Sequence, residues 1–478
     1  MTTTEAIQPS PAADITPVGV TRQRYHLTFA VILLAVLAFA LLQSLVLPAL
    51  PTIRASLHVS QSSVTWVLTA YLLSASIATP ILGRVGDMIG RRKVLVAILV
   101  ILGAGCLITA VASSIAVLIV GRVVQGAGGA VVPLAFGIVR DQFPADRVSG
   151  AVSKVAALLA VGAGLGIILA GPIVDTLNYH YLFWFALIVV AVAAIGAYFF
   201  VPESANTTPG RISVLPALLM AGWLVALLVA VSESGEWGWA SSRTLGLILL
   251  SVVLIVGWIF SELHAAQPLI DMRMMRITTV WTTNLVALVT GMGIFSILTY
   301  VPQFVQTSRT AGYGYGASIT ASGVFLLPMT VAMFAFGLWS GPLTGRIGSK
   351  SVLVIGSALN AFSLAILTLA HQQQWEIYLA SAFAGMGMGF AFAAMSNLTV
   401  QSVPASQTSV ASGMNANIRT IGGSIGAAVM ASLISAHTVA GHFPAATGFT
   451  EGFLFLLIGT VFATIVFVAV PNARRPGQ

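Results

Sequence analysis

The stretch GRVGDMIGRRKVLV at residues 83–96 returns later in the chain as GPLTGRIGSKSVLV at residues 341–354. Gly83, Gly90 and the Val-Leu-Val that ends the stretch all recur at one constant offset. The repeat therefore predicts a chain made of two related halves. Duplicated halves are typical of membrane transporters, in which the binding site is expected near the bilayer midplane between the repeats.

The composition indicates a chain embedded in lipid. Of the 478 residues, 58% are hydrophobic and only 7% are charged, and the mean hydropathy is +0.98. Soluble proteins carry about 25% charged residues, so most of this chain is not built to face water. Cys106 is the only cysteine, which excludes an internal disulfide and a cysteine metal cluster. We expect neither a metal nor a cofactor.

Long stretches without Asp, Glu, Lys or Arg define the membrane spans. In lipid the backbone must satisfy its own hydrogen bonds, which predicts helices of about 20 residues. We predict an all-α integral membrane protein with fourteen transmembrane helices, in two six-helix pseudo-symmetric halves plus an inserted helix pair. The predicted spans are 27–50, 63–83, 94–113, 116–139, 150–174, 181–202, 213–233, 243–263, 279–302, 317–343, 351–371, 376–400, 410–436 and 450–471.

Positive charge shows which side of the membrane is the inside. Sixteen of the 21 Lys and Arg residues fall on the side of the two termini, whereas Arg54, Arg243 and Arg309 fall on the other side. By the positive-inside rule both termini are cytoplasmic. This topology explains the net charge of +8 without a nucleic-acid partner, and we expect a multi-pass protein of the bacterial plasma membrane. The expected order is a cytoplasmic tail at 1–26, a six-helix bundle at 27–202, a two-helix linker at 203–278, a second six-helix bundle at 279–471 and a cytoplasmic tail at 472–478.

The repeated stretch concentrates charge at the inner end of the second span. Gly90 permits a tight reversal, and Gly83 lets another helix approach closely. We expect Asp87 to pair with Arg91 across the turn or with a neighbouring helix end. The alternative is that the basic residues here only anchor the topology, but the repeated spacing favours a specific role.

Four further stretches carry a pattern known from one family. They are WVLTAYLLSASIATPILGRVGD (66–87), GRVVQGAGGA (121–130), EWGWASS (236–242) and SGMNANIRTIGGSIGAAV (412–429). With the repeat, this pattern resembles the major facilitator superfamily, and within it the fourteen-helix drug:proton antiporter branch, over nearly the whole chain. The resemblance implies two halves that rock in alternating access. It also implies that Gly83, Asp87, Gly90 and Arg91 form a conformational gate at the inner face.

Two arginines fall inside predicted spans, where a charge is expensive and marks a candidate functional site. Arg122 lies about six residues into the fourth span, with Gln125 on the same helix face. The resemblance implies that Arg122 supports proton movement. Arg419 lies about ten residues into the thirteenth span, four residues after Asn415. The alternative for both arginines is a packing role, with backbone carbonyls satisfying the guanidinium.

The first span lacks the acid that the family normally carries. In LLQSLVLPALPTI (41–53) the aspartate position corresponds to Leu42. Gln43 and Ser44 are the polar residues nearest to this position. We hypothesise that Gln43 hydrogen-bonds either Arg122 or the substrate. A neutral Gln cannot replace a titrating carboxylate.

No acidic residue lies deep in any predicted span. Asp175 is the leading candidate proton site, because an outer-facing cavity would desolvate it; the alternative is an interfacial helix cap. His180 is close in sequence, and imidazole is the side chain that changes charge nearest neutral pH.

The fifth span carries a stripe of small residues. Gly162 and Gly166 are spaced for close helix packing, and Gly171 with Pro172 extends the stripe. The stretch resembles the family's antiporter motif, but Ile167 stands where a proline is usual, so we expect packing rather than a hinge.

Further polar side chains are expected along the substrate cavity. They are Tyr71, Gln125, Asn284, Tyr300, Gln303, Asn397, Asn415 and Arg419. For the neutral ones, a helix–helix hydrogen bond is an equally good interpretation.

Two buried arginines and no deep acid favour neutral or anionic amphipathic substrates over lipophilic dications. We interpret the chain as a secondary active exporter of drugs, antibiotics or related metabolites that exchanges them for protons, and not as an enzyme. One alternative is an exporter of a single metabolite or antibiotic with a different coupling. A membrane redox enzyme is disfavoured because the seven histidines lie near helix ends or in loops, and an ATP-driven pump because no G-x-x-x-x-G-K-[ST] loop occurs. The expected partners are the lipid bilayer, a small-molecule substrate and protons, with no nucleic acid and no obligatory protein partner.

Overall fold

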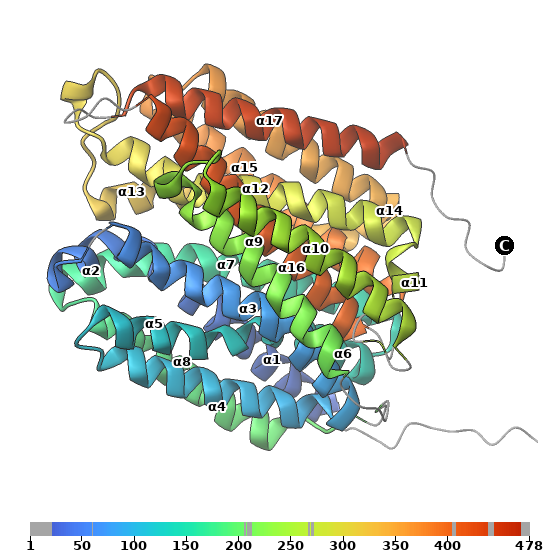
Figure 1. The fold of residues 1–478 in the computed structure, drawn as a ribbon. Helices are drawn as coiled ribbons and strands as arrows, with labels where there is room; N and C mark the ends of the chain where they lie inside the picture. Colours follow the sequence, from blue (N-terminus) through green and yellow to red (C-terminus); the bar gives the residue numbers. More distant parts are fainter. Residues whose placement is uncertain are drawn as a thin grey trace, which may run out of the picture.

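The structure is a computed structural model that describes residues 22–59, 61–204, 207, 213–265, 268, 272–403, 408–437 and 444–469. Long helices run side by side through the molecule (Figure 1). In the first half they are α1 (Arg22–Ser44), α3 (Gln61–Ile89), α4 (Arg91–Ala110), α5 (Ile115–Gln125), α6 (Val131–Gln142), α7 (Ala145–Thr176) and α8 (His180–Phe200). After them come α9 (Val214–Trp237), α10 (Ser242–His264), α12 (Thr278–Gln306), α14 (Leu327–Leu369), α15 (Gln374–Ser402), α16 (Thr408–Ala436) and α17 (Ala446–Ala469). The short elements are α2 (Leu50–Leu57), α11 (Met272–Met275), α13 (Ile319–Phe325) and the 3-10 turns η1 (Gly126–Ala130) and η2 (Arg309–Ala311).

Thirteen helical stretches in the described ranges are long and apolar enough to cross a membrane. One of them, Thr320–Leu369, has 50 residues. A single helix of that length would measure about 75 Å, more than twice the ~30 Å hydrocarbon core. The chain leaves helical geometry inside it at Gly348, with φ 82° and ψ 153°. This stretch therefore holds two crossings, and the total agrees with the fourteen spans that the sequence predicts.

The break at Gly348 confirms the repeat in three dimensions. Gly90, its counterpart in the first half, also has a positive φ, 114°, and separates α3 from α4. Positive φ is a conformation that glycine adopts without steric cost. Each half therefore makes the same reversal with its matched glycine.

The fourth span is not the single helix over 116–139 that the sequence predicts. It consists of α5, the 3-10 turn η1 and α6. The glycines of η1 press against α3, because a Cβ at Gly126 would strike Ser74 and one at Gly129 would strike Thr79. Close approach at these glycines replaces regular α-helical geometry over one turn.

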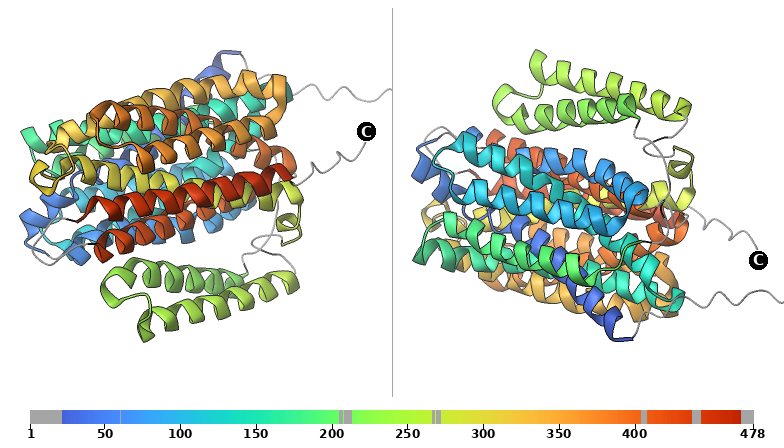
Figure 2. Two further views of the ribbon diagram at one scale, coloured as in Figure 1. Left: turned by 90° about the horizontal axis from the view of Figure 1, so that it is seen from above. Right: turned by 90° about the horizontal axis from the view of Figure 1, so that it is seen from below.

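Two large apolar cores each lie mainly within one half. One joins residues from Ile32 to Val201 and also includes Val400, and the other joins residues from Ile294 to Leu456 and also includes Ile167. Helices α9 and α10 pack on each other outside these bundles, as the two views of Figure 2 show. The inserted pair reaches the rest of the protein through α3 and α16, which come from different halves. The domain boundaries at 202, 278 and 471 stay predictions.

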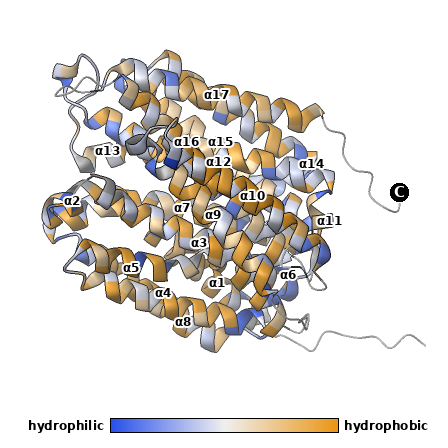
Figure 3. Cartoon of the chain, viewed as in Figure 1, coloured by the Kyte–Doolittle hydropathy of each residue, from blue (hydrophilic) through white to orange (hydrophobic). Residues whose placement is uncertain are grey.

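Hydrophobic residues cover the long outer faces of the helices, and most hydrophilic residues gather toward their ends (Figure 3). Helix α10 is the extreme case, since Leu249, Val256 and Phe260 are all exposed. Such faces suit contact with lipid chains, which is what a multi-pass membrane protein requires.

The two halves touch closely along α7 and α14. A Cβ at Gly164 would strike Thr330, and one at Gly337 would lie 2.7 Å from the Cβ of Ala157. Small residues on both helices therefore let the two backbones approach.

Gly90, Gly345 and Gly348 lie at or near the matched reversals of the two halves. An alanine side chain would meet different surroundings at each of them, which predicts an order of stability for the three variants. Gly345→Ala adds a Cβ in open, exposed helix and should stabilise by roughly 0.5–1 kcal/mol. Gly348→Ala is open but has a positive φ, which costs about 1–2 kcal/mol. Gly90→Ala has positive φ and also drives its Cβ into the Glu203 carboxylate. Thermal unfolding in detergent, followed by tryptophan fluorescence, should rank Gly345→Ala highest and Gly90→Ala lowest; a Gly90→Ala protein as stable as wild type would contradict this account.

Candidate functional site

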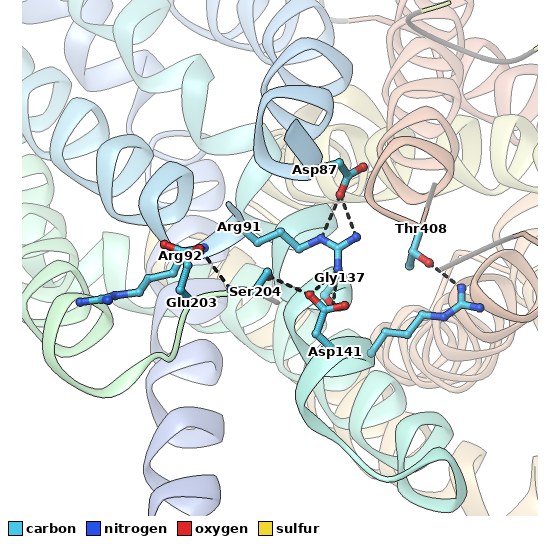
Figure 4. A network of polar contacts seen from close by, with 9 residues as sticks. Asp87, Arg91, Arg92, Gly137, Asp141, Glu203, Ser204 and Thr408 are labelled. Atoms are coloured by element: carbon cyan, nitrogen blue, oxygen red, sulfur yellow. Dashed lines mark hydrogen bonds and ion pairs between the residues drawn. The ribbon is translucent and has the colours of Figure 1, made fainter. Parts of the chain in front are cut away.

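The charged turn between α3 and α4 forms a buried ion-pair network (Figure 4). Arg91 Nη2 lies 2.8 Å from Asp87 Oδ1, and Arg91 Nη1 lies 2.6 Å from Asp141 Oδ2 at the end of α6. Arg91 also donates to the Gly137 carbonyl at 3.1 Å. We call Asp87, Arg91 and Asp141 the inner network. Each of these side chains is no more than 4% exposed, so the ion pairs are shielded from water.

The end of α8 closes over the inner network. Ser204 Oγ donates to Asp141 Oδ2 at 2.7 Å, and the Arg92 backbone N–H donates to Glu203 Oε1 at 3.3 Å. Arg92 Nη2 donates to the Tyr198 carbonyl. The network therefore joins the inner ends of α3, α4, α6 and α8.

Sequence reasoning brought Asp87 and Arg91 together but missed Asp141. The signal was available, because Asp141 is an acid at the inner end of the fourth span, where basic residues dominate. The second half has no such network, since Gly345 and Ser349 stand at the positions of Asp87 and Arg91 in the repeat.

Arg140, the neighbour of Asp141, connects the two halves at the inner end. Its Nη1 donates to the Val400 carbonyl at 2.6 Å and to Thr408 Oγ1, on α15 and α16. Nearby, the Asn397 amide donates to Ser153 Oγ at 3.2 Å. Asn397 is therefore a link between halves, which agrees with the helix–helix alternative for this residue. Sequence reasoning gave Arg140 no role beyond its positive charge.

The outer end is also bridged. Thr320 Oγ1 of α13 donates to Asp175 Oδ2 at 2.8 Å. Asp175 is exposed, and its role as a proton site stays a prediction. His180 does not pair with it. The His180 ring bonds the Ala112 carbonyl at 3.0 Å and stacks on Tyr179.

Arg122 is fully buried, its hydrogen bonds go to neutral groups, and its Nη2 has no described partner. It donates to the Val67 carbonyl at 3.0 Å and to Gln125 Oε1 at 2.8 Å. Its guanidinium carbon lies 4.2 Å from the ring centroid of Tyr71, within the range of a cation–π contact. The predicted bond from Gln43 to Arg122 does not occur; Gln125 takes that place.

A central cavity lies between the two halves. It is lined by residues from α1, α3, α7, α12, α14, α15 and α16, and among the predicted cavity residues Gln43, Tyr71 and Arg419 are included. No Asp or Glu stands among its described lining residues. Its volume is about 100 Å³, below the ~300–1,000 Å³ of sites that hold drug-sized ligands. Polar contacts join the two halves at both ends of the molecule. The cavity is therefore contracted and must open to admit such a ligand.

A smaller cavity adjoins the central one on its inner side. It is about 20 Å³ and is lined by parts of α6, α7, α15 and α16, including Ser412 and Asn415. Arg419 and Phe392 line both cavities. The Arg419 guanidinium carbon lies 4.6 Å from the Phe392 ring centroid. Within the described part of the chain, Arg419 makes no hydrogen bond and no ion pair.

The other predicted cavity residues include several that bond a neighbouring helix. The Asn415 amide donates to Asn284 Oδ1 at 2.9 Å, and Tyr300 Oη donates to the Ala427 carbonyl at 2.7 Å. Gln303 is exposed, and Gln125 holds Arg122 away from the cavity. Asn284, Asn415 and Tyr300 thus make bonds between α12 and α16, while Asn415 also lines the smaller cavity.

The small residues of α7 behave largely as predicted. A Cβ at Gly162 would lie 2.6 Å from Ala40, and one at Gly166 would lie 3.0 Å from the Leu41 carbonyl oxygen, both on α1. Gly171 faces Thr320 of α13 instead. Pro172, in contrast, is exposed.

Comparison with known proteins finds relatives along most of the chain. The Major Facilitator Superfamily matches residues 32–427 and again residues 283–478. The chain is 28% identical to the multidrug transporter protein MdtP of Bacillus subtilis, over 79% of this chain and 69% of that protein. It is also 28% identical to the tetracenomycin C resistance and export protein of Streptomyces glaucescens, with 91% and 80% covered. A uridine/deoxyuridine transporter of Lactococcus lactis is equally similar at 28%, with 82% and 83% covered.

Two solved structures share the fold. The human organic anion transporter MFSD10 matches with a TM-score of 0.67 at 15% identity, covering 93% of this chain and 99% of that one. The proton:xylose symporter XylE matches with a TM-score of 0.64 at 16% identity, covering 94% and 96%.

The inner network should contribute to stability through Asp141. Asp141→Asn removes the charge that Arg91 and Ser204 bond while Asp87 remains, so we expect a loss of about 1–3 kcal/mol, typical of a bond to a charged group. The control is Glu451→Gln, which changes an exposed carboxylate 3.5 Å from His437. Thermal unfolding in detergent should show a lower midpoint for Asp141→Asn only; equal midpoints for both variants would mean that the network adds nothing to stability.

Proposed function

Because this chain belongs to the Major Facilitator Superfamily, whose members are secondary transporters, we propose that it is an exporter of the drug:proton antiporter type. It carries neutral or anionic amphipathic molecules, such as drugs, antibiotics or related metabolites, out across the bacterial plasma membrane. Transport proceeds by alternating access: the links at one end of the cavity open while those at the other end close. Protons moving inward drive the cycle.

The unpaired Arg419 in an acid-free cavity is the observation that carries this proposal. A buried positive charge disfavours cations and leaves donors available to acceptor groups on a ligand. The apolar walls, with Phe39, Phe295 and Met333 among them, suit an amphipathic body. Export as the direction is supported by the Streptomyces relative, which is named a resistance and export protein.

A second candidate is an exporter of one specific metabolite whose coupling differs from proton exchange. The favouring observation is that the cavity lining, where the structure describes it, holds no carboxylate to take up a proton. The uridine/deoxyuridine relative also shows that a similar chain can be named for one substrate class.

Inside-out vesicles with a respiration-driven pH gradient test the leading proposal. A panel of neutral, anionic and cationic amphiphiles is added, and collapse of the gradient is followed by a fluorescent pH probe. Collapse with neutral and anionic compounds supports proton exchange. Uptake of radiolabelled compound without collapse favours the second candidate. Efficient transport of ethidium would contradict the substrate class.

Arg122→Ala should abolish transport while membrane insertion stays intact, because Arg122 organises Tyr71 and Gln125 beside the cavity. The matched control is Arg243→Gln, which removes an exposed arginine beside Trp237. Vesicle transport normalised to the amount of inserted protein is the measurement. Full activity of the Arg122→Ala protein would remove this residue from the mechanism.

Asp87→Asn should slow transport more than it weakens substrate binding. Asp87 does not line the cavity, but it forms an ion pair with Arg91, which also pairs with Asp141. Asp141 is the neighbour of Arg140, which bonds the second half of the protein. Losing one bond to a charge corresponds to about a tenfold change in a rate or equilibrium. We therefore expect turnover to fall about tenfold with Kd nearly unchanged. Unchanged turnover at normal expression would reduce the turn to a topology anchor.

A further inference from the structure

We infer that Arg419, together with Ser412, binds the oxyanion of a singly charged amphiphile, with the small inner cavity holding the oxyanion and the central cavity holding the apolar body. This inference rests on the proposed transport function and names its substrate class.

The first argument is electrostatic. Arg419 has no hydrogen-bond or ion-pair partner among the residues that the structure describes, and neither cavity is lined by a described Asp or Glu. An uncompensated charge inside a membrane bundle is costly, and such residues mark substrate paths. A ligand oxyanion would supply the missing counter-charge.

The second argument is geometric. The guanidinium carbon lies over the Phe392 ring at 4.6 Å, and no described residue bonds its N–H groups, so these groups are available to grip a carboxylate with two bonds. Ser412 lies seven residues before Arg419 on the same face of α16. Its hydroxyl oxygen is buried without a partner, and the residue is 6% exposed.

The third argument is size. The inner cavity of about 20 Å³ has room for roughly one water-sized group, so it takes one oxygen of the oxyanion while the other oxygen stays beside Arg419 at the junction with the central cavity. Because Arg419 and Phe392 line both cavities, an oxyanion held there places the rest of the molecule against the apolar walls of the central cavity.

The fourth argument concerns the number of charges. Arg419 is the one charged residue in the described lining of the two cavities. Arg122 is not among the lining residues of either cavity, and its bonds go to Gln125 and the Val67 carbonyl behind the Tyr71 ring. A single available arginine matches one negative charge better than two.

The test compares 1-pyrenebutyrate with its uncharged methyl ester. The full chain is placed in nanodiscs of phosphatidylcholine, and binding is followed by pyrene fluorescence against empty discs. Wild type should bind the acid more tightly than the ester. Arg419→Gln should weaken acid binding by about 10- to 100-fold, as expected for lost bonds to a charge, and leave ester binding within about twofold. Arg419→Lys should restore part of the preference, Ser412→Ala should lose a smaller part, and Arg243→Gln should match wild type.

Ester binding by Arg419→Gln shows that the variant is folded. If the acid preference survives in Arg419→Gln, the inference is overturned while the proposed export of amphiphiles stands. If wild type binds neither compound and transports no amphiphile in vesicles, the proposed function itself fails. Adding phosphatidylglycerol to the discs distinguishes the source of the oxyanion: displacement of the acid assigns the site to a lipid headgroup, and no displacement assigns it to the free amphiphile. Both outcomes support an oxyanion site at Arg419.

Discussion

Lipid supplies neither a counter-ion nor a hydrogen-bond partner, so each charge inside the bundle has to be matched by protein or by ligand. This constraint explains the placement of the few charges. Arg91 is matched by two carboxylates, and Arg122 by carbonyls, an amide and an aromatic ring. Arg419 alone of these three arginines has only a ring beside it. The difference separates two arginines that organise helices from one that is available for a ligand.

The close approach of neighbouring helix backbones is the second requirement of the fold. Glycines set the reversal in each half, press η1 onto α3 and bring α7 against α14. Such contacts hold without interlocking large side chains, so the halves can shift along them. The polar links at the two ends, Arg140 with Val400 and Asp175 with Thr320, can then break and form as separate events.

Features that depend on one segment of the chain could be predicted from the sequence, whereas contacts between distant segments could not. The charge-free stretches predicted the transmembrane spans, and the repeated glycines predicted the chain reversals at Gly90 and Gly348, because both features depend on local chemistry. The partners of Arg91 and Arg140 come from residues far along the chain, which no single motif encodes. The polar residues Asn284, Asn397 and Tyr300 were left with two interpretations for a related reason. They lie on helices, and their sequence positions do not say whether they face a cavity or another helix.

Arg419 in a cavity without a described carboxylate also has an electrical consequence. A cell interior is negative, so an organic anion that leaves it moves down the membrane potential. The gain is about 2.3 kcal/mol per 100 mV for one charge, which sustains a concentration ratio of roughly 50-fold. A carrier that neutralises its cargo with its own fixed arginine lets the resting voltage contribute to expulsion, even where no residue of the cavity takes up a proton.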